Sequence, residues 1–320
     1  MLPKKLFFAF WVTLVCYLNG SALAGQSPEN SFIELAPGEF TEDQTFINWR
    51  NMAPGIDILE FKLQKYPAED LLQKIKISAI LHETQDAQAN FIIVRSEPKK
   101  CGYSLHMTSE DGHRQTMLKR VQNHKLYAAI NAGMFLPDNL KNTGFMRNAT
   151  HVNNGRIASN FGVFFLAGPR KAGLPQAIIL EKSDMGDKLT EKIADYDIVI
   201  QNYRLISSTG KILWPDSPET YSISALSADK AGNILFIFCA VPLSAADFSR
   251  VLLALPLGIN LTMYLEGGSQ AGLITVEGVE NTRQKTGYRI WGGLHRAFAG
   301  FTAFEHLALP NVLGVFSNLN

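Results

Sequence analysis

Two segments of the sequence join a strand-like apolar run to a polar side chain and glycine. Residues 127–130 (Tyr-Ala-Ala-Ile) precede residues 131–133 (Asn-Ala-Gly), and residues 261–265 (Leu-Thr-Met-Tyr-Leu) precede residues 266–268 (Glu-Gly-Gly). Because glycine has no Cβ, a ligand can approach its backbone closely, and successive N–H groups in such a turn can bind an anion. Each turn is therefore a candidate ligand site at the edge of a sheet. The alternative for each is an ordinary tight turn.

These two turns belong to a longer series of motifs that resembles the phosphodiester glycosidase family. The motifs follow the family's order and lie within roughly residues 57 to 316; they are residues 127–135, 160–164, 200–202, 263–268 and 309–315. The known activity of that family includes removal of N-acetylglucosamine from a phosphodiester on mannose. The resemblance implies hydrolysis of the bond between a sugar's anomeric carbon and an esterified phosphate, at a site built from the Asn-Ala-Gly and Glu-Gly-Gly turns.

The chain departs from the better-known members of the family at three places. It has Glu266 where they carry Asp, and residues 221–226 (Tyr-Ser-Ile-Ser-Ala-Leu) contain no Arg where they carry one. After Gln201 it has Asn-Tyr-Arg instead of Ser-Gly-Pro. Arg204 is therefore the candidate replacement for the missing phosphate-binding arginine, and its alternative is a surface residue.

The chemistry implied by the resemblance requires a group that stabilises an oxocarbenium-like centre and donors for the leaving phosphate. Glu266 can serve as nucleophile, as base for water or as electrostatic stabiliser. Asp138 is the candidate second carboxylate, unless it is a solvated turn residue beside Pro137. Asn131 is expected to hold a sugar hydroxyl or the phosphate, or else to satisfy backbone groups of its own turn.

The candidate substrate-binding residues are the turn glycines and four polar residues in the motifs or in the loops between them. They are Gly133, Gly267, Gly268, Gln201, Arg204, Arg147 and His151. A planar guanidinium suits phosphate oxygens, whereas an isolated Arg or His is more commonly a surface residue.

Two further functions remain as alternatives. Residues 267–271 nearly match the Gly-x-Ser-x-Gly elbow of serine hydrolases, with Ser269 as nucleophile, although residues 273–276 read as a strand and not as the helix that an elbow opens. The same concave site could instead hold a cell-envelope saccharide or phosphoglycan without turnover. The histidines include neither a His-x-His nor a His-Glu-x-x-His pattern, so a zinc enzyme is unsupported, and the sequence assigns no cofactor.

Composition and the N-terminal segment indicate where the protein works. Residues 1–24 combine Lys4 and Lys5, a short apolar run and a small-x-small end, which is typical of an export signal. We expect a periplasmic or secreted protein with a leader at 25–45, a domain at 46–320 and no membrane segment after signal removal. The formal net charge of +1, with no basic run, argues against nucleic acid as a partner.

The remaining pattern predicts the elements that position the two turns. Strand-like runs occur throughout, at residues 56–63, 89–94, 126–130, 161–166, 177–180, 197–201, 222–226, 234–241 and 261–265. A helix is expected after Ser244, which forms a capping box with Asp247, and a weaker one within 108–124. We therefore predict an α+β fold, a single mixed-sheet domain with flanking helices. Outside the signal, Cys101 and Cys239 could form one disulfide or remain buried thiols.

Overall fold

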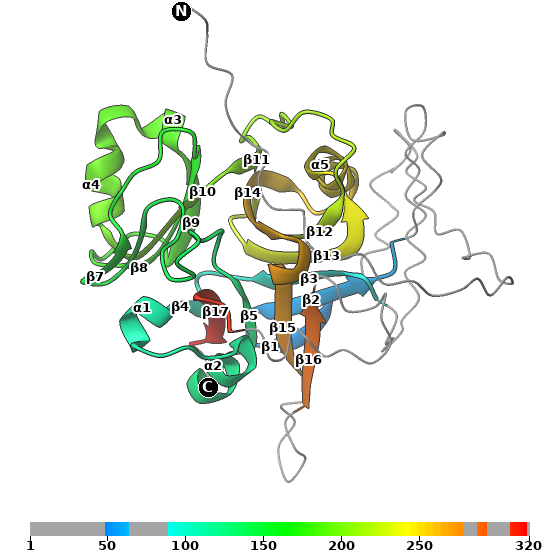
Figure 1. Ribbon diagram of the computed structural model, residues 1–320, viewed down its shortest axis with the longest axis horizontal. Helices are drawn as coiled ribbons and strands as arrows, with labels where there is room; N and C mark the ends of the chain where they lie inside the picture. The colour runs from blue at the N-terminus through cyan, green and yellow to red at the C-terminus, as the bar shows by residue number, and fades with distance from the viewer. Residues whose placement is uncertain (1–48, 64–88, 278–286, 293–307, 319–320) are drawn as a thin grey trace, which may run out of the picture. The chain divides into compact units, whose positions relative to one another are not determined.

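The computed structural model describes residues 49–63, 89–277, 287–292 and 308–318, whose strands form three sheets (Figure 1). The seven-stranded sheet has the order β1 (Arg50–Ala53), β2 (Ile56–Phe61), β3 (Phe91–Ser96), β13 (Ile234–Leu243), β12 (Tyr221–Asp229), β14 (Ile259–Gly267) and β11 (Arg204–Ile206). The β5 sheet has the order β16 (Gly287–Gly292), β15 (Gly272–Glu277), β5 (Ala128–Asn131), β17 (Asn311–Ser317) and β4 (Cys101–Met107). The β10 sheet has the order β7 (His151–Asn154), β6 (Met146–Asn148), β10 (Tyr196–Asn202), β8 (Val163–Pro169) and β9 (Ala177–Glu181). The predicted signal at 1–24 and leader at 25–45 lie outside the described residues.

One hydrophobic core is shared by all three sheets. Phe236 of the seven-stranded sheet, Ile130 of the β5 sheet and Phe165 of the β10 sheet belong to the same buried cluster. The strands that line it are apolar on both faces, as in β13, where residues 234–239 are all buried. Such continuous apolar runs are expected in a sheet that is covered on both sides.

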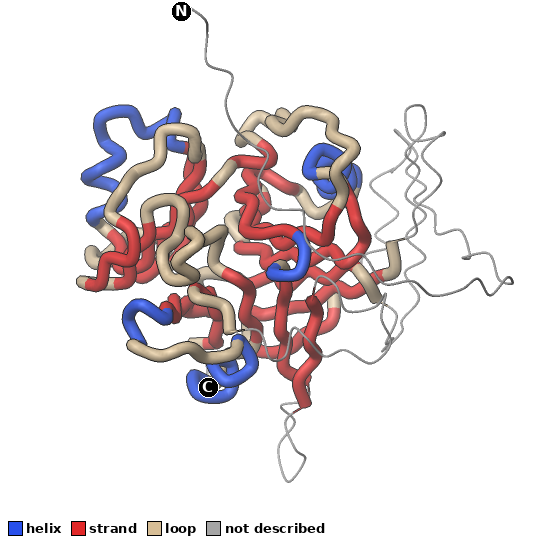
Figure 2. Tube along the Cα trace, in the orientation of Figure 1, coloured by secondary structure: helices blue, strands red, loops and turns tan. Residues whose placement is uncertain are grey.

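Each sheet has a second, outer core that a short helix covers. Helix α5 (Ala245–Ala254) packs on the seven-stranded sheet, α2 (Met117–His124) on the β5 sheet and α4 (Leu189–Ala194) on the β10 sheet. Two further helices, α1 (Thr108–Asp111) and α3 (Lys182–Met185), are single turns, as are the 3₁₀ segments η2 (Gly186–Lys188) and η3 (Gly268–Gln270). Figure 2 shows how far strands predominate over helices.

The predicted fold class needs correction. The domain is mainly β, and every strand pair formed by the described residues is antiparallel, so the sheets are not mixed. The helix expected within residues 108–124 is interrupted at Gly112, which adopts φ +73° and ends α1, and the chain resumes as α2 only after the cap at Thr116. Short helices of this kind cover sheet faces and do not form a layer of their own.

Several local predictions are confirmed. Each predicted strand segment overlaps an observed strand, and helix α5 begins after Ser244, whose Oγ accepts the N–H of Asp247 at 3.0 Å. The helix buries Phe248, Val251 and Leu252 against the sheet. Satisfying an otherwise unpaired N–H at the first turn is what makes such a cap stabilising.

Cys101 and Cys239 are both buried as thiols and do not form a disulfide with each other. Cys101 Sγ donates to the carbonyl of Gly55 at 3.2 Å, and burial raises the pKa of the Cys101 thiol to about 11. In the described part of the chain no helix is long and apolar enough to span a membrane.

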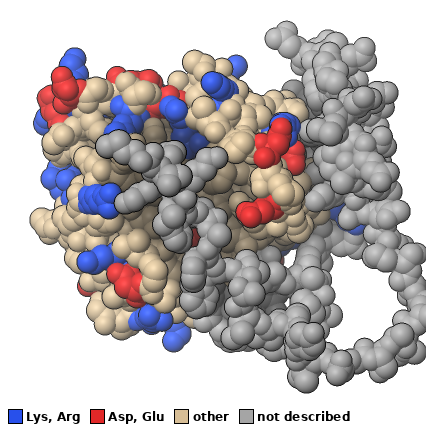
Figure 3. All heavy atoms as spheres, turned by 45° about the horizontal axis from the view of Figure 1, so that its top comes forward, with Lys and Arg blue, Asp and Glu red and all other residues tan. Residues whose placement is uncertain are grey.

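Charged side chains of both signs are interspersed on the face shown in Figure 3. Several form exposed ion pairs, such as Arg170 Nε with Asp197 Oδ1 at 2.7 Å and Lys100 Nζ with Glu97 Oε2 at 2.7 Å. Exposed pairs of this kind contribute about 0–1 kcal/mol each. The stability of the fold therefore rests on its four buried clusters.

Candidate functional site

The Asn-Ala-Gly turn and the Glu-Gly-Gly turn meet in the folded chain. Ser224 of β12 lies opposite Glu266 in the strand register, and its Oγ is 3.3 Å from the Glu266 carbonyl oxygen. The same hydroxyl donates to Asn131 Oδ1 at 2.7 Å. Asn131 Oδ1 also accepts the N–H of Gly272 at 3.2 Å. One serine thus links two residues that are 135 positions apart in the sequence.

The topology explains this meeting. Strand β14 belongs to the seven-stranded sheet and β15 to the β5 sheet, and η3 is the short connection between them. Because β15 pairs with β5, with Leu273 opposite Ile130, the chain that leaves Glu266 must pass the end of β5. The crossing between two sheets therefore brings the backbone of Glu266 close to Asn131.

Asn131 has a hydrogen-bond donor available. The residue is only 2% exposed, and both contacts above use its Oδ1, whereas its Nδ2 has no hydrogen-bond partner among the described residues. A buried amide donor without a partner costs about 1–3 kcal/mol. Such a group is a candidate for contact with a ligand oxygen.

Glu266 is half-buried and forms no ion pair with any described residue. Its Oε1 accepts the N–H of Gly267 at 3.1 Å. Burial raises the pKa of the Glu266 carboxyl to about 7, although that N–H opposes the shift. The pKa values of Tyr264 and Tyr221 are raised as well, chiefly by burial, so both phenols stay neutral beside it. Near neutral pH the Glu266 carboxyl can therefore accept or donate a proton.

The turn glycines have different roles. A Cβ on Gly133, which has φ +127°, would lie 2.8 Å from Asn142 Oδ1 and 3.0 Å from Asn202 Nδ2. A Cβ on Gly267 would lie 2.4 Å from the Tyr264 hydroxyl oxygen. These two glycines leave room for the protein's own side chains, and their predicted role in substrate binding stays a prediction. Gly268, with φ +69°, has open space at that position and keeps the predicted role as a proposal.

Gln201 is a structural cross-link, which corrects a predicted role. It is fully buried, and its Oε1 accepts the N–H groups of Phe145 and Ala158 at 3.1 and 2.9 Å. Its Nε2 donates to the carbonyls of Ala158 and Phe161 at 2.8 and 2.9 Å. The amide of Gln201 therefore has no capacity left for substrate.

Arg147 and His151 lie in the β10 sheet and are engaged there. Arg147 Nη2 donates to the carbonyls of Ile193 and Tyr196 at 2.6 and 2.5 Å, which holds the end of α4 against β10. His151 Nε2 lies 3.0 Å from Ser109 Oγ. Neither residue hydrogen-bonds to Asn131 or Glu266 in the described structure, and their predicted role as substrate contacts stays a prediction.

Asp138 is a turn residue. It is exposed, and its Oδ1 accepts the N–H groups of Leu140 and Lys141 at 2.9 and 3.0 Å. Those two donors hold the pKa of Asp138 below its usual value. The carboxylate therefore stabilises its own turn, which is the alternative that the sequence left open, and its role as the second catalytic carboxylate stays a prediction.

Arg204 is paired inside the protein. Its Nη1 lies 2.5 Å from Oε2 of Glu181, a residue whose side chain is only 6% exposed. Oε1 of Glu181 accepts the N–H of Ser208 at 2.6 Å. The charge of Arg204 is thus paired with a buried carboxylate, and its role as a phosphate ligand stays a prediction.

Ser269 lacks the context of a serine nucleophile. It is exposed within η3, between two strands, and no histidine of the described residues hydrogen-bonds to it. An elbow would require a helix at this point, whereas β15 follows. The structure around Ser269 therefore gives no support to the serine hydrolase alternative.

Sequence reasoning missed three residues that build the site. Ser224 joins the two turns, and Asn142 and Asn202 enclose Gly133. Asn202 stands in one of the family-like motifs, which was the available signal. Nothing in the local sequence marks Ser224, because its role depends on the register between β12 and β14.

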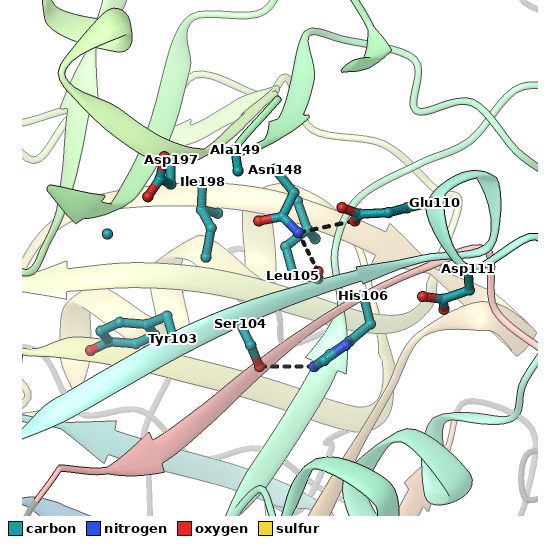
Figure 4. A pocket seen from close by; sticks show the side chains of 11 residues that line it. Tyr103, Ser104, Leu105, His106, Glu110, Asp111, Asn148, Ala149, Asp197 and Ile198 are labelled. Atoms are coloured by element: carbon teal, nitrogen blue, oxygen red, sulfur yellow. Dashed lines mark hydrogen bonds between the residues drawn. The ribbon is translucent and has the colours of Figure 1, made fainter. Parts of the chain in front are cut away.

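A separate cavity of about 480 Å³ lies beside β4 and the β10 sheet (Figure 4). Its walls carry Ser104 and His106, and Ser104 Oγ lies 2.8 Å from His106 Nε2. Burial lowers the pKa of His106 to about 4, so the ring stays neutral. In the described structure no carboxylate orients that ring, and none of the predicted site residues lines the cavity. The chemistry of a hydrolytic site is therefore better met at Glu266.

No group of three or more His, Cys, Asp or Glu side chains among the described residues is placed to hold a metal ion.

Comparison with known proteins decides the family. Residues 124–315, more than half of the chain, match the phosphodiester glycosidase family, and both turns of the site lie within the matched region. The chain belongs to the phosphodiester glycosidase family. No curated protein matches the chain significantly.

The solved structures that are similar to this chain include one from Synechocystis and one from zebrafish. A hypothetical protein from Synechocystis superposes with a TM-score of 0.50 at 14% identity, over 86% of this chain and 64% of that one. The chain therefore spans less than two thirds of that protein's length. The zebrafish N-acetylglucosamine-1-phosphodiester alpha-N-acetylglucosaminidase catalytic domain, auto-inhibited by its pro-peptide, gives a TM-score of 0.46 at 12% identity, over 70% of this chain and 76% of that one. At these identities the first similarity supports the fold alone.

Proposed function

We propose that this phosphodiester glycosidase is an exported hydrolase that cleaves a sugar-1-phosphodiester at the anomeric C–O bond, with Glu266 as the reacting carboxylate. The observation that carries the proposal is the juxtaposition at the two turns. Ser224 Oγ joins the Glu266 backbone carbonyl to Asn131 Oδ1, so the residue that carries a half-buried carboxylate without an ion pair in the described residues lies close to the residue with an unpartnered amide donor. Family membership supplies the class of bond.

The proposed reaction is a one-step displacement. The ionised Glu266 carboxylate takes a proton from a water molecule, whose oxygen bonds to the anomeric carbon as the C–O bond to phosphate breaks. The bonding electron pair leaves with the phosphate oxygen, and the products are the free sugar and a phosphomonoester. Since phosphate departs without protonation, one carboxylate suffices, and the anomeric configuration is expected to invert. Asn131 Nδ2 donates to a sugar hydroxyl or to the phosphate.

The proposed site of action is the periplasm or the exterior of the cell. Support comes from residues 1–24, whose charge and hydropathy pattern is typical of a cleaved export signal. Expression of the full chain followed by N-terminal sequencing of the exported form should show Gly25 as the first residue. Recovery of the protein in the cytosol with Met1 intact would contradict this part of the proposal.

The function is tested with purified mature protein and a panel of sugar-1-phosphodiesters that includes those of N-acetylglucosamine and glucose. Release of sugar is followed by proton NMR, which also reports the anomer formed first. We expect turnover with inversion in the wild type and a loss of at least about 100-fold in Glu266→Gln, because the amide cannot accept the proton of water.

Asp138→Asn is the matched control, since it removes an exposed carboxylate that only caps a turn. It should retain wild-type turnover. Full activity of Glu266→Gln on a substrate that the wild type hydrolyses would remove Glu266 from the mechanism.

A non-catalytic saccharide binder is the second candidate. Strand β12 lacks the arginine that better-known members carry, and Arg204 is neutralised by Glu181. Calorimetric titration with the same panel separates the two functions. Saturable binding without any product would favour the binder, whereas product formation that depends on Glu266 favours the hydrolase.

A further inference from the structure

Four aromatic side chains from four different segments form a continuous cluster, which we call the aromatic wall: Tyr203, Trp214, Tyr221 and Tyr264. The ring of Trp214 lies 5.6 Å from that of Tyr203 and 5.3 Å from that of Tyr264, measured between centroids. Tyr203 follows β10, Trp214 lies in the loop after β11, and the two other tyrosines belong to β12 and β14. All four pack on the outer core of the seven-stranded sheet.

The aromatic wall borders Glu266. Tyr264 is two residues before Glu266 on β14, and its hydroxyl oxygen would lie 2.4 Å from a Cβ built on Gly267. The Tyr221 ring covers the same glycine, with its Cδ2 2.7 Å from that position. The negative charge of Glu266 contributes to the raised pKa of both phenols, as expected for close neighbours. The wall and the carboxylate are therefore parts of one surface.

The wall is partly open and its rings are held in place. Tyr203, Trp214 and Tyr221 are half-buried, whereas Tyr264 beneath them is buried. Trp214 Nε1 donates to the carbonyl of Arg204 at 3.2 Å, and the Tyr203 hydroxyl accepts from Asn160 Nδ2 at 3.0 Å. Fixed aromatic faces that reach solvent beside a reactive carboxylate are arranged as in a preorganised ligand site.

We infer that the aromatic wall is the sugar subsite, on which the substrate's pyranose ring stacks with its anomeric carbon toward Glu266. This inference rests on the function proposed above. A pyranose has an apolar C–H face and a rim of hydroxyls, which matches rings that combine an apolar face with a polar group. A hydrated phosphate dianion or diester gains nothing from such faces, so the phosphate lies away from the wall. The wall therefore selects the sugar and not the alcohol on the far side of the phosphate.

Binding is tested by intrinsic fluorescence in the Glu266→Gln background, where substrate is not consumed. The probes are N-acetylglucosamine, glucose and their methyl-1-phosphodiesters. We expect a saturable change in tryptophan emission that disappears in Trp214→Phe. Trp49→Phe is the matched control, since Trp49 precedes β1 at the opposite edge of the seven-stranded sheet, and it should keep the change. A change that survives Trp214→Phe but is lost in Trp49→Phe would overturn the inference, as would the lack of any response to all four probes.

The kinetic constants of Trp214 variants that retain Glu266 distinguish a role of the aromatic wall in sugar binding from a role in the chemical step. Trp214→Ala should raise KM about tenfold with kcat nearly unchanged, because stacking stabilises the bound substrate and the transition state alike. Trp214→Phe should recover most of the loss, and thermal unfolding should show that both variants are folded. Turnover by the wild type with an unchanged KM in folded Trp214→Ala would reject the subsite and leave the proposed function standing. A Trp214-dependent fluorescence response in a protein without turnover would support the subsite and reject the hydrolase.

Discussion

Burial of the Glu266 carboxyl without a cation among the described residues is unfavourable for folding, whereas the proposed reaction requires that carboxyl. The carboxyl group of Glu266 is close enough to the Tyr221 and Tyr264 phenols to contribute to their raised pKa values, and among the described residues it receives a single N–H donor, from Gly267. A structural carboxylate in such a place would have a cation, as Glu181 has Arg204. The raised pKa of Glu266 therefore marks a residue that is kept at some cost to stability.

That cost gives the first prediction at the residue scale. The folded-state pKa of Glu266 is raised from its ordinary value of 4.5 to about 7, so the folded chain holds a proton that the unfolded chain loses between these values. The contribution of Glu266 to the free energy of unfolding consequently falls as pH rises from 4.5 to 7 and stays low above 7. Glu266→Gln, which does not ionise, should be more stable than the wild type above pH 7, by about 1–3 kcal/mol.

Urea unfolding at a series of pH values measures this difference. The gap should close as pH is lowered toward 4.5 and vanish below it, where the wild-type carboxyl is protonated in both states. Asp138→Asn serves as the control, because the pKa of Asp138 is shifted in the opposite direction from that of Glu266. The pKa of Asp138 is held low by backbone donors, so its replacement should not stabilise the protein at any pH. A Glu266→Gln variant less stable than the wild type at neutral pH would show that the carboxylate is needed for the fold.

At the scale of elements, the ion pair between Glu181 and Arg204 joins the end of β9 in one sheet to β11 in another. Arg204→Met should lower the free energy of unfolding by about 3 kcal/mol, because it leaves a buried carboxylate without its cation. Arg170→Met, at an exposed pair with Asp197, is the matched control and should cost no more than about 1 kcal/mol.

A double-mutant cycle with Glu181→Gln isolates the pair. The Glu181→Gln and Arg204→Met substitutions together should cost less than the sum of the two, because the uncompensated charge is then absent. Additive losses, together with a weakened affinity for phosphodiester in Arg204→Met alone, would support Arg204 as a phosphate ligand.

At this scale, a feature could be predicted from the sequence where the residues that produce it lie close together in the chain. Helix α5 was predictable because its cap, apolar face and stop signal all lie within Ser244–Gly258. The role of Gln201 was not, since its four partners come from Phe145, Ala158 and Phe161, which local pattern cannot place beside it. The meeting of Asn131 with Glu266 needed the crossing between β14 and β15, and Ser224 between them follows only from strand register.

At the scale of the whole molecule, one core bounded by three antiparallel sheets explains both the success and the failure of the fold prediction. Period-two and apolar runs indicated most strands, but the short strands β6, β7 and β11 carry too few residues for a pattern. Sheet membership was beyond reach, because Ile237 pairs on one side with Ala225 of the preceding strand and on the other side with Ile93, which lies far earlier in the sequence. Mixed sheets were expected where the structure has antiparallel ones.

A chain with so large a shared core does not depend on a disulfide. Cys101 and Cys239 are both inaccessible, and the high pKa of Cys101 keeps its thiol protonated at pH 8. We expect the native protein to resist iodoacetamide at that pH, and both thiols to react after denaturation, as counted by mass spectrometry. Melting temperatures should be equal with and without reductant. A lower melting temperature in reductant would show that the two cysteines pair.

The central claim, that the ionised Glu266 carboxylate performs the chemistry, is tested most directly by the pH dependence of kcat/KM for sugar-1-phosphodiester hydrolysis. Since kcat/KM reports the ionisation of the free enzyme, the rate should rise with pH through a midpoint of about 7, and Glu266→Gln should show no such rise in its residual rate. A rate that falls through pH 7 would mean that the protonated carboxyl is the active form. A wild-type profile that is flat between pH 5 and 9 would mean that Glu266 is not the reacting group.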